Sequence, residues 1–90
     1  MFVETITSGR EDWEFFGQGT RLTSDPPATL VLSVAWDAGD DHVTVLNVWD
    51  SGEAIADFYV ERVRPLIEQR GEPADKPKRH GAPLDVYVRG

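Results

Sequence analysis

The chain of 90 residues contains no cysteine, which excludes disulfide bridges, thiolate metal sites and a cysteine nucleophile. It also lacks any apolar stretch close to the ~20 residues that a membrane-spanning helix requires. The opening segment MFVETITSGRED has neither the basic start nor the long apolar run of a signal peptide. We therefore expect a cytoplasmic protein that does not enter a membrane.

Basic residues are scarce in the first half of the chain. Residues 1–50 contain nine acidic and two basic side chains, whereas residues 51–90 contain seven of each, so the net charge of -7 comes from the first half. This charge would repel duplex nucleic acid, and the sequence has no basic stripe with interleaved aromatic residues. Nucleic-acid binding is therefore not expected.

The length and the apolar content of 40% predict one folded domain over residues 1–90. Phe2–Thr7 is rich in β-prone residues and is expected to form a strand. Ser8 and Glu11 have the spacing of a capping box, so a short helix is expected over residues 9–18. A loop containing Pro26 and Pro27 follows, because proline has no N–H donor and a fixed φ.

Two β-prone segments, Leu30–Trp36 and Val43–Trp49, flank a short turn that contains glycine, which predicts an antiparallel hairpin. Neither segment alternates cleanly between apolar and polar residues, as a strand with one face in water should. We therefore expect helices to cover one face and a second copy of the protein to cover the other. In the first segment, the side chains expected on one face are Leu30, Leu32, Val34 and Trp36.

The segment from Asp50 or Ser51 to Gly71 has the three- and four-residue apolar spacing of one long helix. Arg62 lies within this apolar stripe. Pro65 cannot donate to the carbonyl of Glu61, so a bend is expected there.

The chain then continues through a basic, proline-rich stretch over residues 72–83, expected to be a loop, to a last strand over Leu84–Val88. The element order is β-α-β-β-α-β. It predicts an α+β, ferredoxin-like domain in which two helices lie on one face of an antiparallel sheet.

One predicted strand ends in an aromatic residue, an acid and a serine, and Glu-Ala and a helix bearing a phenylalanine follow it. This pattern resembles the dimeric α/β-barrel superfamily, also called antibiotic-biosynthesis-monooxygenase-like. Within it, the chain most resembles short uncharacterised actinobacterial proteins. The resemblance implies a homodimer whose sheets pack face to face, with a cavity between sheet and helices. It does not specify an activity, because the members range from cofactor-free monooxygenases to stress-response proteins. The residues that carry it are Val45–Ser51, Glu53, Ala54, Phe58, Glu61–Leu66 and Gly71.

Five side chains are candidates for binding a ligand in such a cavity: Trp36, Asn47, Trp49, Tyr59 and Arg62. Asn and Trp side chains help cofactor-free monooxygenases bind a polycyclic phenol, and the resemblance implies this role for Asn47 and Trp49, with Trp36 as a neighbour across the hairpin. Arg62 could hold an anion by charge-assisted hydrogen bonds. The alternative interpretation is structural: the aromatic residues form the core, Asn47 bonds to a backbone group, and the stem of Arg62 packs while its head reaches solvent or pairs with a carboxylate.

His42 and His80 are the only histidines, and neither has the spacing of metal ligands, so no metal and no cofactor is expected. Two hypotheses remain open. The first is a homodimer that binds a small aromatic or anionic ligand, with cofactor-free, monooxygenase-like chemistry. The second is a non-catalytic structural or stress-related dimer whose core is filled by its own side chains.

Overall fold

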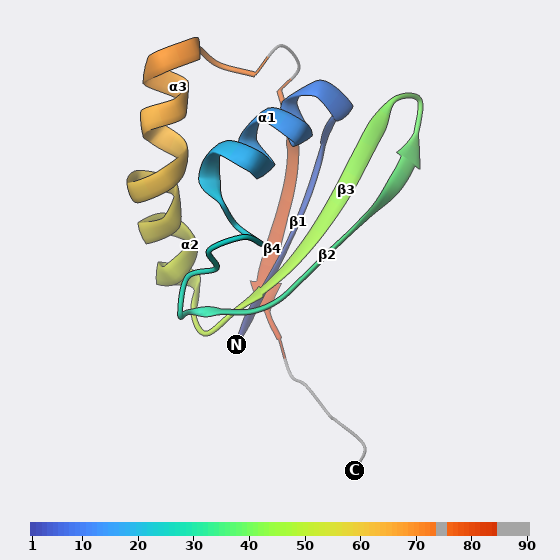
Figure 1. Ribbon diagram of the computed structural model, residues 1–90. Helices are drawn as coiled ribbons and strands as arrows, with labels where there is room; N and C mark the ends of the chain where they lie inside the picture. The colour runs from blue at the N-terminus through green and yellow to red at the C-terminus, as the bar shows by residue number, and fades with distance from the viewer. Residues whose placement is uncertain (74–75, 85–90) are drawn as a thin grey trace.

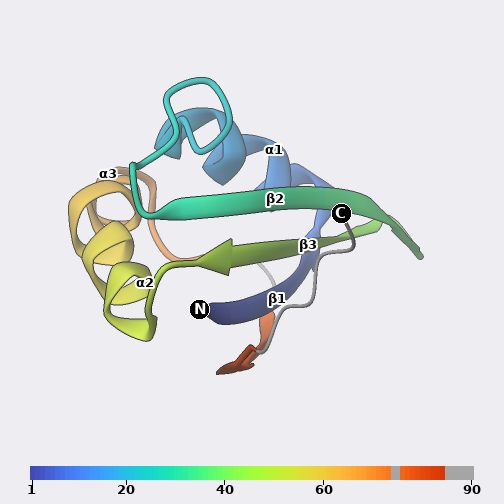
Figure 2. The same ribbon diagram turned by 90° about the horizontal axis from the view of Figure 1, so that it is seen from below.

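The computed structural model describes residues 1–73 and 76–84 and contains one four-stranded antiparallel sheet with strand order β2-β3-β1-β4. The helices gather on one side of this sheet, and the strands can be followed in order across the view from below (Figures 1 and 2). The predicted ferredoxin-like β-α-β-β-α-β class is therefore confirmed. The elements are β1 (Phe2–Gly9), α1 (Arg10–Thr20), β2 (Leu30–Gly39), β3 (His42–Trp49), α2 (Gly52–Phe58), the π-helix η1 (Tyr59–Val63), α3 (Arg64–Arg70) and β4 (Lys78–Pro83).

The β2–β3 hairpin is present as predicted, but its register assigns faces differently. A register shift between Asp37 and Gly39 pairs Trp36 with Thr44, and a second shift pairs Leu30 with Trp49. Trp49 packs on Phe58 of α2, with ring centroids 5.3 Å apart, so its face of the sheet is the one that the helices cover. The prediction that Leu30 and Trp36 share a face is wrong, because extra residues in β2 reverse the alternation of its side chains.

The face of the sheet that points away from the helices is apolar along β2. Leu32, Val34 and Trp36 pair with Val48, Leu46 and Thr44, respectively. These three β2 side chains remain 52%, 45% and 46% exposed. We call this surface, which Leu32, Val34 and Trp36 define, the open face. Its composition agrees with the prediction that both faces of the hairpin are apolar.

The start of α1 differs from the expected capping box. Ser8 stays in β1, paired with Val43, and Gly9 is the N-cap without a side-chain hydrogen bond. The amide of Arg10 donates instead to the carbonyl of Asp41 in the hairpin turn, at 2.9 Å. A tertiary backbone contact therefore replaces the local cap that the sequence predicted.

The second helical region begins and ends as predicted. The Ser51 side chain accepts a hydrogen bond from the Ala54 amide at 3.3 Å, and Gly71 ends the region with φ 112°. Between α2 and α3 the chain forms the π-helix η1, in which the amide of Arg64 donates to the carbonyl of Tyr59. The predicted interruption near Pro65 therefore takes the form of a wider turn, which accommodates a residue without an N–H donor.

The last strand lies earlier in the chain than expected. Lys78–Pro83, predicted as part of a loop, forms β4 at the sheet edge and pairs antiparallel with β1. Leu84 follows the end of β4, and the rest of the predicted strand, residues 85–88, lies outside the described residues. The sequence of β4 is not β-prone, so the strand owes its place to backbone pairing with β1.

Candidate functional site

Three polar side chains form a buried cluster between the sheet and the helices. Glu4 of β1 accepts two hydrogen bonds at Oε1, one from Nδ2 of Asn47 at 3.1 Å and one from Nε1 of Trp49 at 3.0 Å. Glu4, Asn47 and Trp49 are 7%, 2% and 0% exposed, respectively. We call these three residues the Glu4 cluster. Its position follows from the register, because Glu4 stands directly opposite Asn47 in the β1–β3 pair.

One acceptor in the Glu4 cluster has no partner. Oδ1 of Asn47 is buried and accepts no hydrogen bond from any residue that the structure describes. Leaving a buried acceptor unsatisfied costs about 1–3 kcal/mol. Most native proteins avoid such atoms, and those that remain call for a specific explanation. Oδ1 of Asn47 is therefore a point where a donor from outside the chain would gain a hydrogen bond.

The carboxylate of Glu4 has no close cation. Among residues 1–73 and 76–84, no lysine, arginine or histidine forms an ion pair with it. Gly81 lies opposite Glu4 on β4 and offers no side chain. The ring of Phe2 occupies this space, since a Cβ added to Gly81 would approach Phe2 Cε1 to 2.8 Å. The Glu4 cluster is thus held by neutral donors beside an exposed sheet edge.

Arg62 is close to the Glu4 cluster but does not point at it. Its Nη1 donates to the carbonyl of Thr20, the last residue of α1, at 3.2 Å and to that of Asp25 in the following loop at 2.6 Å. The guanidinium carbon lies 5.8 Å from the centroid of the Phe58 ring, and Phe58 in turn packs on Trp49. The structural interpretation left open whether the head of Arg62 reaches solvent or pairs with a carboxylate, and the observed partners are instead two backbone carbonyls.

The other two predicted residues lie apart from the cluster. Trp36 belongs to the open face, on the side of the sheet opposite Asn47, so the expected contact across the hairpin is not formed. Tyr59 is the first residue of η1. The guanidinium carbon of Arg64 lies 5.9 Å from the centroid of the Tyr59 ring. Of the five predicted side chains, only Asn47 and Trp49 donate hydrogen bonds to a common partner, Glu4.

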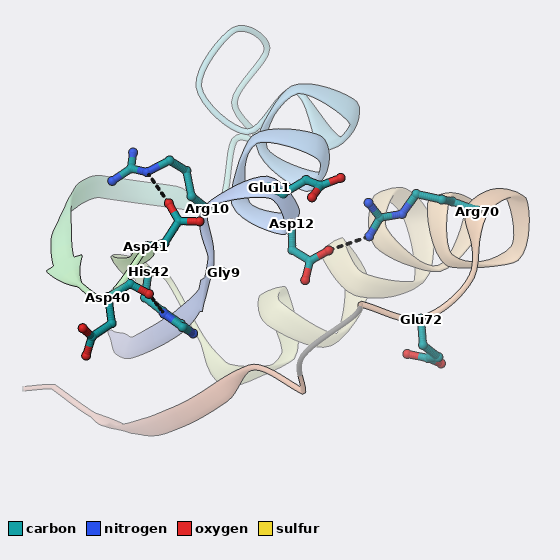
Figure 3. A pocket seen from close by; sticks show the side chains of 9 residues that line it. All are labelled: Gly9, Arg10, Glu11, Asp12, Asp40, Asp41, His42, Arg70 and Glu72. Atoms are coloured by element: carbon teal, nitrogen blue, oxygen red, sulfur yellow. Dashed lines mark hydrogen bonds and ion pairs between the residues drawn. The ribbon is translucent and has the colours of Figure 1, made fainter.

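A cavity of about 400 Å³ lies away from the Glu4 cluster, near the hairpin turn and the start of α1 (Figure 3). Asp12 and Arg70 face each other there, with Oδ1 and Nη2 2.8 Å apart. His42 bonds through Nδ1 to the carbonyl of Asp40 at 2.7 Å, and His80 is exposed on β4. No group of three or more potential metal ligands occurs among the described residues.

Glu4 was not identified from the sequence, although a signal was present. In Phe2–Thr7, Glu4 stands between Phe2 and Ile6 on the same strand face. An acid flanked in this way is placed in the core, where it requires hydrogen-bond donors. The two donors that it finds are the side chains Asn47 and Trp49, which were identified.

No protein-family model matches the sequence, and no curated protein matches it. Solved structures share the fold of this chain. A protein of unknown function from Nitrosomonas europaea superposes with a TM-score of 0.67 at 6% identity, covering 99% of this chain and 94% of the other. A "putative antibiotic biosynthesis monooxygenase" from Deinococcus radiodurans superposes with a TM-score of 0.58 at 13% identity, covering 100% of both chains.

These comparisons show that this chain shares its ferredoxin-like fold with both solved structures. At this level of identity they establish the fold alone. The expected closeness to actinobacterial proteins stays a prediction. No helix among the described residues has the length and apolar character needed to cross a membrane.

Proposed function

We propose that the protein is a homodimer that binds a small aromatic ligand between the sheet and the helices, at the Glu4 cluster. The observation that carries the proposal is the buried, unpartnered Oδ1 of Asn47. In a core that serves only packing, this unsatisfied acceptor is destabilising, whereas a hydrogen-bond donor on a ligand would satisfy it. Trp49 and Phe58 supply the aromatic surface beside it. A cytoplasmic location belongs to the same proposal.

The charge at the site favours one of the two ligand classes expected from the sequence. The carboxylate of Glu4 is buried beside Asn47 and would repel an anion. Arg62, the expected anion-binding residue, already donates to two backbone carbonyls. An aromatic ligand that carries a hydrogen-bond donor therefore fits the site better than an anionic one.

The description of the Deinococcus radiodurans protein adds a reaction to test. In a cofactor-free monooxygenation, the ligand itself supplies the electrons: a ring CH₂ group and O₂ give a ring carbonyl and water. Oxygen uptake that depends on both the protein and a compound with such a CH₂ group, for example anthrone, would support catalysis. If oxygen uptake with the protein equals the uptake by anthrone without protein, the proposal is limited to ligand binding.

The open face supports the dimer. It exposes three large apolar side chains side by side, Leu32, Val34 and Trp36, whereas scattered single exposures are the norm for a monomer. A two-fold axis would place the same surface of a second copy against it, since isologous contacts are self-complementary.

The test compares ligand binding by the wild type with that of two variants on opposite faces of β3. Asn47→Leu removes the unpartnered acceptor, and Thr44→Val removes a hydroxyl that bonds to Thr7 at 2.9 Å on the open face. Thermal unfolding is followed with and without 2-naphthol. A ligand present at 100 times its Kd stabilises the folded protein by about 2.7 kcal/mol.

We expect the stabilisation in the wild type and in Thr44→Val, and its loss in Asn47→Leu. Equal stabilisation of all three proteins would show that the ligand does not bind at Asn47. The absence of any stabilisation by aromatic ligands would contradict the proposal.

A second candidate function is a non-catalytic structural dimer. The observation that favours it is that the guanidinium of Arg62 donates to the backbone carbonyls of Thr20 and Asp25. These hydrogen bonds hold the helices together and leave that nitrogen engaged within the chain rather than directed at a ligand. This function predicts that Asn47→Leu raises the stability of the unliganded protein, because it removes an unsatisfied polar atom, and that no aromatic ligand changes the melting temperature.

A further inference from the structure

We infer that Glu4 determines the ligand specificity of the site: it selects aromatic ligands that carry a hydroxyl or amino donor and rejects carboxylates. This inference rests on the proposed function and names the residue that sets its substrate class. It is carried by three features of the Glu4 cluster, which are the orientation of Asn47, the uncompensated charge of Glu4, and the absence of a side chain on Gly81 opposite it.

The first feature is the orientation of the Asn47 amide. Oε1 of Glu4 accepts from the donor end of the amide, Nδ2, at 3.1 Å. The acceptor end, Oδ1, is thereby left for another partner. Trp49 donates to the same Oε1 at 3.0 Å and fixes the carboxylate. Glu4 is therefore a positioning residue that makes Asn47 present an acceptor to a ligand.

The second feature is the charge. Among the described residues Glu4 has no ion-pair partner, and its two hydrogen-bond donors are neutral. A ligand carboxylate bound about 6 Å away would be disfavoured by on the order of 100-fold at the effective dielectric constant of a protein interior. A neutral hydroxyl group carries no such penalty.

The third feature is the absence of a side chain where a cation could stand. Gly81 is the residue opposite Glu4 in the β1–β4 pair, and directly opposed residues are those that most often compensate a charge. Arg79 pairs with Ile6, one position further along the same face, and its side chain is exposed. The ring of Phe2, rather than a cation, therefore covers Gly81 beside the carboxylate.

The experiment measures the affinity of three matched probes, 2-naphthol, 2-methoxynaphthalene and 2-naphthoate, by titration of the indole N–H resonance of Trp49. For the wild type we expect 2-naphthol to bind about tenfold tighter than 2-methoxynaphthalene, which cannot donate, and about 100-fold tighter than 2-naphthoate. In Glu4→Gln the preference over 2-naphthoate should fall to about tenfold or less. In Arg79→Gln it should be unchanged.

The outcomes separate the two proposals. If no probe binds the wild type, the proposed function fails. If the probes bind but 2-naphthoate equals 2-naphthol, the assignment of Glu4 fails while the binding site stands, and this comparison needs no variant that folds. A parallel loss of affinity for all probes in Glu4→Gln would indicate a merely structural role. A changed preference in Arg79→Gln would show that Arg79 neutralises Glu4 and would likewise overturn the inference.

Discussion

Replacing Val34 with aspartate tests whether the open face joins two copies of the protein. Val34 lies on β2 opposite Leu46 and is 45% exposed in the single chain. A polar group at this position remains in water in a monomer but is buried in a dimer. Val60 on η1, 48% exposed on the helical side of the molecule, provides a matched control for the same substitution.

The expected effect can be worked from the exposure of Val34. Full burial of a valine side chain is worth about 1.5 kcal/mol. The 45% that is still exposed therefore represents about 0.7 kcal/mol per copy and about 1.4 kcal/mol per dimer, or about tenfold in Kd. An unpaired carboxylate adds a desolvation penalty of several kcal/mol per copy. Val34→Asp should therefore weaken dimerisation by more than about 1,000-fold, and Val60→Asp by less than about twofold.

Sedimentation equilibrium at micromolar concentration measures this difference. The wild type and Val60→Asp should sediment at about twice the chain mass of 10.1 kDa. Val34→Asp should sediment as a folded monomer, with its helical content checked by circular dichroism. A wild type that is a well-folded monomer at this concentration would refute the reasoning, as would a Val34→Asp variant that remains fully dimeric.

Two further predictions concern side chains that hold the helices. Arg62→Met removes the donor to the backbone carbonyls of Thr20 and Asp25 and should lower the free energy of unfolding by about 1–3 kcal/mol in urea titrations, with unchanged affinity for 2-naphthol. A selective loss of affinity would instead place Arg62 in the ligand site. Asp12→Asn weakens the 2.8 Å contact to Arg70 and should lower stability by about 1–2 kcal/mol, because the Asp12 side chain is only 8% exposed. Glu11→Gln, an exposed neighbour, should stay within about 0.5 kcal/mol of wild type, and an equal effect of both changes would contradict the role of the buried contact.

The parts of the fold that local sequence encodes were predictable. The β2–β3 hairpin follows from two β-prone segments around a turn, and the cap at Ser51 and the end at Gly71 follow from side-chain and backbone preferences. The β4 strand was not predictable in this way. Its residues Lys78–Pro83 include glycine and proline, and pairing with β1 places them in the sheet. Tertiary pairing overrides local propensity there.

The site was predicted in part for a related reason. Asn47 and Trp49 share a strand face by simple alternation, and the structure preserves this relation. Trp36 was assigned to the same face, but the register shift between Asp37 and Gly39 moves it to the other side. A shift of one residue is not encoded in the apolar pattern, because both faces of the hairpin are apolar. The same two-sided pattern grouped Leu32, Val34 and Trp36 correctly but did not indicate which face of the sheet they join.

The alternation of β3 also separates binding from assembly. Asn47 faces the helices and Leu46 faces the other way, although they are adjacent in the chain. A ligand at Asn47 and a second copy at Val34 would therefore contact opposite sides of one sheet and share no side chain. If both proposals hold, the Val34→Asp monomer still binds 2-naphthol with nearly wild-type affinity, because the Glu4 cluster lies entirely within one chain. Loss of binding on dissociation would mean that the second copy holds the sheet in the conformation that binds, which would couple the two functions through the backbone of β3.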